Sequence, residues 1–367
     1  PRGASSLDET VDRAENFVSL FFSPLAEQGF VLLNGDIVFA QDASTESTAL
    51  FGKLDWHFSD QWTLSVSGRW ARDRKSVDQA MLNREDPAFD VALLTAQGHP
   101  DPQVVLGIPA NAPENLFAYL ITGSADFLQT PYAVSASESW DEFLPSAYLN
   151  WYFSDSATAY LSYSEGYKSG AFQSQTPTPE AAVTPLEPET AASVELGLKS
   201  EWLDNRLRVN VAAFHIDYSD LQVFQLVGSL LVGGNAEATS KGVEMEAVAL
   251  LTDAWQLGLN YGYLDATYDV YLLGEQDLSG NSLARAPEHS LSVNTRYSWV
   301  LDGGSSLDLS VVWSWQDEFY FVPSNEPAAL QPDYGLLDAR LDWQTEHWEL
   351  SLWGRNLTDE LYRINTF

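Results

Sequence analysis

Cysteine is absent from this sequence of 367 residues, which excludes disulfide bonds, thiolate zinc sites and cysteine nucleophiles. Long apolar runs are absent too, since no stretch reaches the ~18 to 20 consecutive apolar residues of a membrane-spanning helix. A helical membrane protein is therefore excluded. A transmembrane β-strand needs only ~9 to 11 residues with apolar side chains at alternate positions, so the sequence has to be inspected for a period of two.

Positive charge is scarce: 18 Lys and Arg stand against 52 Asp and Glu, a formal net charge of -34. Nucleic acid is not expected as a partner, because its phosphates would repel the chain. Catalytic motifs such as His-Glu-x-x-His and Gly-x-Ser-x-Gly are missing. The histidines are scattered, at His57, His99, His215, His289 and His347. The sequence therefore predicts no enzyme, no cofactor and no protein metal site.

Alternation of apolar and polar residues is the main pattern that is present. Apolar side chains occupy every second position through most of 62–70, 255–263, 291–299 and 307–315, with mainly polar side chains between them. This period of two is typical of strands with one apolar and one wet face.

Short polar breaks join these strands in pairs, at 59–61, 154–156, 203–205, 252–254, 302–305 and 345–347. Much longer connections lie between the pairs, at 73–141, 173–188, 272–286 and 322–333. Six hairpins predict about twelve strands, and 17–40 is a candidate for one more. Tight turns that alternate with long loops are typical of an all-β, antiparallel transmembrane β-barrel.

Tryptophans lie within a few residues of the short breaks and in phase with the apolar face: Trp56, Trp62, Trp151, Trp202, Trp255, Trp299, Trp343 and Trp348. An indole settles at the bilayer interface, so this set predicts an aromatic girdle at one membrane depth. A soluble β-sandwich or propeller also alternates, with the apolar face as its core. Such a fold gives no reason for a tryptophan beside every tight turn.

The surplus of acid is concentrated in the connection 73–141, which carries ten Asp and Glu against three Lys and Arg. Such a surface is typical of solubility in salt-rich surroundings. Two alternatives stay open: attraction of cationic or metal-carrying ligands, and divalent ions that bridge loop carboxylates to anionic lipopolysaccharide.

A family resemblance begins at 163–172, Tyr-Ser-Glu-Gly-Tyr-Lys-Ser-Gly-Ala-Phe, which resembles a strand-to-loop segment of TonB-dependent outer-membrane receptors. Further segments are similar to other signatures of that family, at 186–200, 213–221, 234–246 and 353–362. The resemblance covers about 49–367 and leans towards siderophore receptors.

The resemblance implies an import receptor with a plugged barrel of the 22-stranded type in the outer membrane of a Gram-negative bacterium. Its ligand would be a ferric siderophore that carries its own iron, and TonB with ExbB and ExbD would supply energy through the plug. The implied surroundings are outer-membrane lipid and lipopolysaccharide, and the implied state is a monomer. A passive porin-like channel, an importer of a vitamin or oligosaccharide, and a soluble carbohydrate-binding β protein remain alternatives.

The chain is expected to divide into an N-terminal extracellular loop and strand region, 1–46, and barrel strands with loops, 47–367, without a plug domain. Candidate ligand contacts are aromatic and polar residues where strands become loops: Trp140, Tyr167, Lys168, Phe172, Tyr218, Tyr271, Phe319 and Tyr320. An outer aromatic girdle is the alternative interpretation of the same residues.

Overall fold

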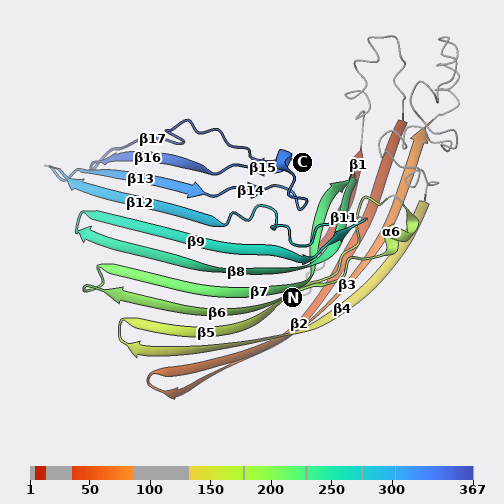
Figure 1. The fold of residues 1–367 in the computed structure, drawn as a ribbon, viewed down its shortest axis with the longest axis horizontal. Coiled ribbons are helices and arrows are strands. Elements are labelled where there is room, and N and C mark those ends of the chain that lie inside the picture. The colour runs from red at the N-terminus through yellow and green to blue at the C-terminus, as the bar shows by residue number, and fades with distance from the viewer. Residues whose placement is uncertain are drawn as a thin grey trace, which may run out of the picture.

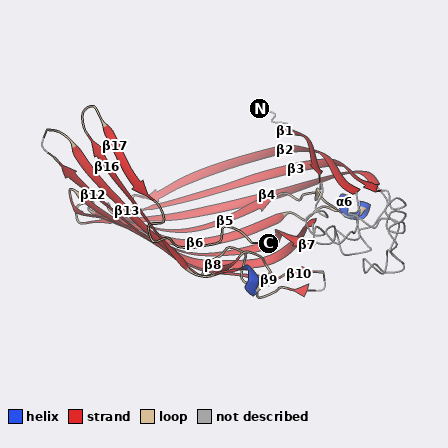
Figure 2. Ribbon diagram, turned by 90° about the horizontal axis from the view of Figure 1, so that it is seen from above, coloured by secondary structure: helices blue, strands red, loops and turns tan. Residues whose placement is uncertain are grey.

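One large curved antiparallel sheet and two small two-stranded sheets form the computed structural model, which describes residues 5–13, 35–85, 132–176, 178–227, 230–274, 276–301 and 303–366. The large sheet is the wall of the molecule. Its 13 strands lie side by side in sequence order (Figures 1 and 2). They are β1 (Ser5–Arg13), β2 (Gly35–Ser59), β3 (Trp62–Glu85), β4 (Tyr132–Ser154), β5 (Ala157–Lys168), β6 (Glu189–Trp202), β7 (Leu207–Val227), β8 (Leu230–Thr252), β9 (Trp255–Val270), β12 (His289–Val300), β13 (Ser306–Gln316), β16 (Tyr334–Gln344) and β17 (Glu349–Gly354).

Short elements lie in the longer connections: α6 (Pro179–Val183), β10 (Leu272–Leu273), β11 (Gln276–Asp277), β14 (Phe319–Tyr320), β15 (Leu330–Gln331) and the 3-10 helix η2 (Pro327–Ala329). Neither helical element of the described chain is long and apolar enough to cross a membrane.

The predicted hairpins are confirmed. Each of the six short breaks joins two neighbouring strands, which accounts for twelve of the strands, and β1 pairs with β2. The six short breaks lie at one end of the sheet, and the longer connections lie at the other, together with the short one between β7 and β8 (Figure 1). The turn after β6 bends through Leu203, Asp204 and Asn205, all with positive φ. We call the two ends of the sheet the turn end and the loop end.

The predicted bounds of one loop differ from the structure. The connection 73–141 was expected to be a loop, but β3 continues to Glu85 and β4 begins at Tyr132, because their backbones pair from Trp62 and Trp151 to Met81 and Tyr132. The candidate strand 17–40 lies largely outside the described residues, and its last part belongs to β2. The expected division between residues 46 and 47 falls inside β2.

One face of the sheet, the outer face, carries the apolar phase of the hairpins. Leu54 in β2, Leu196 in β6 and Leu352 in β17 are 65%, 60% and 72% exposed. Large apolar side chains that the described chain leaves uncovered over a whole face fit contact with hydrocarbon and not a dry core.

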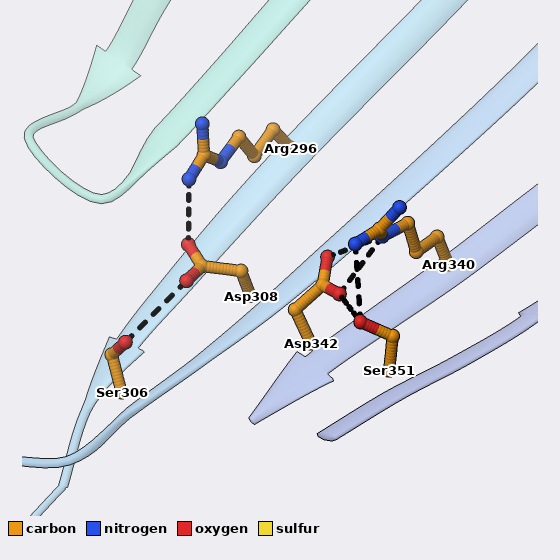
Figure 3. A network of polar contacts seen from close by, with 6 residues as sticks. All are labelled: Arg296, Ser306, Asp308, Arg340, Asp342 and Ser351. Atoms are coloured by element: carbon orange, nitrogen blue, oxygen red, sulfur yellow. Dashed lines mark hydrogen bonds and ion pairs between the residues drawn. The ribbon is translucent and has the colours of Figure 1, made fainter. Parts of the chain in front are cut away.

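The opposite, inner face carries the polar phase. Figure 3 shows six of its side chains: Arg296, Ser306, Asp308, Arg340, Asp342 and Ser351. Arg296 of β12 donates to Asp308 of the neighbouring strand β13 at 3.1 Å. Within β16, Arg340 donates to Asp342 at 2.8 Å. A hollow of about 580 Å³ lies on this face, lined in part by Tyr160, Lys199, Asn210, Glu244, Glu246 and Asn260. Mixed charges and amides therefore face the side predicted to be an aqueous bore.

Aromatic residues mark two levels on the outer face. Near the turn end the rings of Trp62 and Trp151 stack, with centroids 5.4 Å apart and planes inclined by 7°. Towards the loop end, Trp70 of β3 and Phe143 of β4 pair across the same two strands. The stretch from Trp62 to Trp70 matches the ~9 to 11 residues with which a tilted strand crosses a bilayer, and indoles favour its interfaces.

Beyond Trp70 the polarity of the two faces is reversed. On the outer face, Thr48, Arg72 and Asp141 form one row across β2, β3 and β4. On the inner face, Val77 and Met81 are each only 3% exposed. These strands therefore leave the hydrocarbon near Trp70 and continue as a sheet in water with its apolar side inward.

Candidate functional site

The loop between β5 and β6, residues 169–188, covers the inner face of β3 and β4 at the loop end. Gln79 Nε2 of β3 donates to the Gln173 carbonyl at 2.8 Å, and the Tyr132 hydroxyl of β4 lies 2.7 Å from Thr176 Oγ1. The helix α6 in this loop packs against β4. The loop therefore covers the side chains of Val77 and Met81 on the inner face.

The other side of the same loop is fastened to β7 and β8. Gln222 Nε2 of β7 donates to the carbonyls of Ser169 and Glu187, at 3.1 and 2.9 Å. In β8, Asn235 Nδ2 also donates to Glu187, and the Gly233 amide donates to Gln173 Oε1 at 2.8 Å. Side-chain amides of β7, β8 and the loop therefore hold this side of the loop in place.

Trp140, Tyr167, Lys168 and Phe172 lie within this arrangement, where β4 and β5 meet the loop. The rings of Trp140 and Phe172 are 6.5 Å apart and tilted. A Cβ at Gly170 would lie 2.4 Å from the Trp140 ring and 2.6 Å from the Leu186 carbonyl, so only glycine fits there. The close backbone approach holds the loop against the tryptophan.

The charges in this group are mixed. Lys168 pairs with Glu189 of β6 at 3.6 Å, and it lies close enough to Lys75 of β3 for the two positive charges to interact. Burial is the largest cause that lowers the pKa of Lys75, and Lys168 lowers it further, while Asp73 raises it. Lys75 was missing from the predicted contacts because it fell in the expected loop.

The Tyr167 hydroxyl is buried and lies close to the Asp73 carboxylate. Burial, followed by the negative charges of Asp73 and Glu142, raises its pKa to about 12. The phenol is therefore neutral at physiological pH, and its hydroxyl is a donor beside the carboxylate of Asp73. We call Lys75, Trp140, Tyr167, Lys168 and Phe172 the mouth cluster.

Tyr218 and Tyr271 belong to a second group. They pack with Val223, Ala236, Ala238, Tyr268 and Leu278 in an apolar cluster that the loop 271–288 completes. Tyr271 is 0% exposed, so in this conformation it supports the wall and cannot touch a ligand. Its burial comes from the cluster around it, which no local pattern at Tyr271 indicates.

Phe319 and Tyr320 form a third group in β14. The Phe319 ring packs edge-on against Phe321, and Arg285 lies 5.2 Å from the centroid of the Phe321 ring. The Arg285 amide donates to the Tyr320 carbonyl at 2.7 Å. The eight predicted contacts therefore fall into three groups along the loop end, and the first and third combine partly exposed aromatic side chains with cationic ones.

No three His, Cys, Asp or Glu side chains gather in a metal-binding arrangement among the described residues.

The fold and its two aromatic levels define the wall of a transmembrane antiparallel β-barrel. The family model described as "TonB dependent receptor-like, beta-barrel" matches residues 13–357, and the chain belongs to this family. It is a family of receptors and not of enzymes, and its barrels lie in the outer membrane of Gram-negative bacteria, as predicted. The turn end is accordingly the periplasmic end, and the loop end faces the exterior.

Similar proteins include a probable TonB-dependent receptor, BfrD, of Bordetella pertussis, 27% identical over 186 residues, which are 50% of this chain and 25% of that protein. Among solved structures, the ferric yersiniabactin uptake receptor of Yersinia pestis aligns with a TM-score of 0.69 and 19% identity, over 90% of this chain and 43% of that one. The siderophore receptor PiuA of Acinetobacter baumannii aligns with a TM-score of 0.61 and 20% identity, over 89% and 41%. The chain thus spans less than half the length of these relatives.

Proposed function

We propose that the receptor containing this chain imports a ferric siderophore, which binds at the outer mouth of the barrel and enters when TonB, with ExbB and ExbD, acts on a plug domain. Membership of the family supports the energised mechanism. A relative of Pseudomonas putida that is 28% identical over 149 residues, 39% of this chain and 18% of its own length, is a ferric-pyoverdine receptor. That similarity supports the choice of ligand class.

The observation that carries the proposal is the chemistry of the mouth cluster. A siderophore surrounds Fe³⁺ with oxygen ligands and presents an oxygen-rich and often anionic surface. Lys75 and Lys168 supply positive charge, and the Tyr167 hydroxyl, beside Asp73, supplies a hydrogen-bond donor. Trp140 and Phe172 supply flat apolar area beside them. Cations next to aromatics suit such a ligand better than a neutral sugar.

Iron uptake tests the function directly. In a strain that lacks the natural gene and grows under iron limitation, we expect uptake of radiolabelled iron from at least one siderophore to fall to background and to return with the intact gene. Uptake that is unchanged for every siderophore class would contradict the assignment. Uptake that persists after TonB is removed would favour a passive channel instead.

A matched pair of lysines tests the mouth cluster. Lys168→Gln should raise the half-saturating siderophore concentration about tenfold, because a charge-assisted contact is lost. Lys241→Gln is the control: Lys241 also pairs with a carboxylate, at 3.1 Å, and its side chain is 54% exposed against 55% for Lys168, but it lies on the outer face. Equal effects of the two substitutions would remove the mouth cluster from the binding site.

A further inference from the structure

A strip of the inner face on β9, β12 and β13 carries no charged side chain over three successive rows. The pairing of these strands gives the rows, in order from the loop end, as Gly262, Ser290 and Gln316; Asn260, Ser292 and Ser314; and Gly258, Asn294 and Val312. The charged network of Figure 3 begins with Arg296, in the next row towards the turn end. Glu244 and Glu246 of β8 border the rows on one side, and Asp338 of β16 borders them on the other. We call these rows the neutral strip.

The polar side chains of the neutral strip are free to bind a molecule in the bore. None of them is buried, and none makes a side-chain hydrogen bond with the described residues. The charged side chains around the strip, in contrast, bind one another. Arg208 and Asn210 of β7 donate to Glu246 at 3.5 and 3.3 Å, and Arg296 donates to Asp308. The strip therefore offers hydroxyl and amide groups whose partners have to come from water or from a molecule inside the barrel.

The neutral strip also adds little bulk to the bore. A Cβ at Gly258 would lie 2.5 Å from Asn294 Nδ2, and one at Gly262 would lie 2.8 Å from Ser290 Oγ, so these two side chains lie over the glycines. The hollow of about 580 Å³ extends over the two rows nearest the loop end, where its lining residues are Asn260, Gly262, Ser290, Ser292, Ser314 and Gln316. The described wall thus leaves space beside its free hydroxyl and amide groups.

A second uncharged part of the inner face, on β3 to β5, is built differently. Tyr148, which lies opposite Ser65, and Tyr160 place large side chains on it. Ser65 is only 8% exposed and donates to Asp55, and the Tyr160 hydroxyl donates to Glu195 at 2.5 Å. The polar groups on this part are therefore used within the wall, so lack of charge, small size and free hydrogen-bonding groups coincide in the neutral strip.

From these observations we infer that the neutral strip is the side of the bore along which the ferric siderophore passes inward when the plug moves, an inference that rests on the proposed function. A ligand in transit has to be bound at each position and released again, so weak hydrogen bonds in series suit its passage. An unpaired arginine or lysine would retain an anionic ligand, and an unpaired glutamate would repel it. The hydroxyl and amide groups of the strip do neither.

Cysteine labelling in the full natural receptor tests the route. This chain has no cysteine, so Ser292→Cys introduces a single thiol into it. Thr158→Cys is the matched control, because Thr158 of β5 lies on the inner face in the same row of paired residues, outside the strip. Cells take up radiolabelled Fe³⁺ from a catecholate or hydroxamate siderophore in the presence of a membrane-impermeant maleimide. Labelling of the Ser292→Cys variant should rise several-fold during uptake and stay low without TonB, whereas labelling of the control should not rise. Equal labelling of the two positions would overturn the inference.

Uptake rates test the size and the charge of the strip separately. Ser292→Trp should lower the maximal uptake rate about tenfold, because it narrows the route, and should leave siderophore binding at the mouth unchanged. Thr158→Trp should leave both unchanged. Ser292→Glu should slow uptake more than Ser292→Gln, which has the same length without the charge. The heat-dependent gel mobility of a folded barrel verifies that each variant folds.

Two results would overturn the inference: equal uptake rates for the two tryptophan variants, or equal rates for Ser292→Glu and Ser292→Gln. Failure of the proposed function looks different, because the unaltered receptor itself would then take up iron from neither siderophore class.

Discussion

Strands β2 to β4 are built in opposite ways on the two sides of the level of Trp70. On the membrane side, Leu54 and Val66 face outward and are exposed, while Ser65 and Ser67 face inward. On the exterior side the outer face is polar and the inner face buries Val77. The strands continue unbroken from one environment to the other, so the surrounding solvent, and not the strand, decides which phase is apolar.

The change from hydrocarbon to water also explains the loop 169–188. Inside the bilayer the apolar phase needs no protein cover, because lipid provides it. In water the apolar side chains on the inner face of β3 and β4 have to be covered by the chain itself, and the loop does so. Its two backbone bonds between Ala171 and Leu186, at 3.2 and 2.8 Å, close it into a compact layer.

Val77→Asp should have the largest effect on the exterior part. The substitution places an unpaired carboxylate on the covered inner face, at a cost of about 3 to 5 kcal/mol in local stability. The loss should appear in native-state hydrogen exchange as faster exchange of the amides of Ala171 and Leu186. Ser76→Asp, one residue away on the outer face, should leave that exchange unchanged. If both variants expose the loop equally, the polarity of the faces is not reversed there.

Leu259→Arg tests the membrane part, where the costly face is the opposite one. Leu259 lies midway between Trp255 and Tyr263 on the outer face of β9, so the charge would enter mid-bilayer at a cost of about 2 to 4 kcal/mol. Asn260→Arg should cost far less, because Asn260 lines the inner hollow and lies opposite Glu246 of β8. Refolding titrations in lipid vesicles measure both. Equal losses would mean that the two faces of β9 are assigned wrongly.

Alkaline pH should have the smallest effect, confined to the exterior apolar cluster. Burial, and then the neighbouring Tyr271, raises the pKa of Tyr268 to about 12, and Tyr268 is only 3% exposed. The fold favours the neutral phenol, so its contribution to stability is complete below the ordinary pKa of 10 and is lost as the pH rises towards 12. Phenolate absorbance should show a late phase to which Tyr167 and Tyr268 both contribute, and Tyr268→Phe should lower the amplitude of that phase by one tyrosine. A late phase of unchanged amplitude in the variant would show that Tyr268 ionises normally.

Much of the fold could be predicted because each membrane strand follows a local rule. The features that allowed the prediction depend on residues close together in the sequence. They are the alternation through 255–263 and 307–315, the tryptophans beside the turns and the short polar breaks. The two ends of the loop 73–141 were predicted wrongly for the same reason. Above the membrane, serine, arginine and aspartate occupy the outer phase of β3 and β4, and a strand that is polar on its outer side resembles a loop when it is judged for apolar alternation.

The mouth cluster could be predicted only in part. Trp140, Tyr167, Lys168 and Phe172 are found from their position at strand ends, and the structure brings them together. Lys75 joins them because β3 continues past the expected end of the strand. Tyr271 looked equivalent to them in sequence, but packing of the loop 271–288 buries it.

The sequence by itself determined the barrel wall. Neighbouring side chains of each strand face hydrocarbon and water in turn, so apolar residues occur at every second position. Only the tertiary structure decided how far the strands extend beyond the membrane, which loop covers which face and which side chains meet at the mouth. Those features depend on contacts between residues far apart in the chain, such as Gln79 with Gln173 and Gln222 with Glu187, and no local period records them.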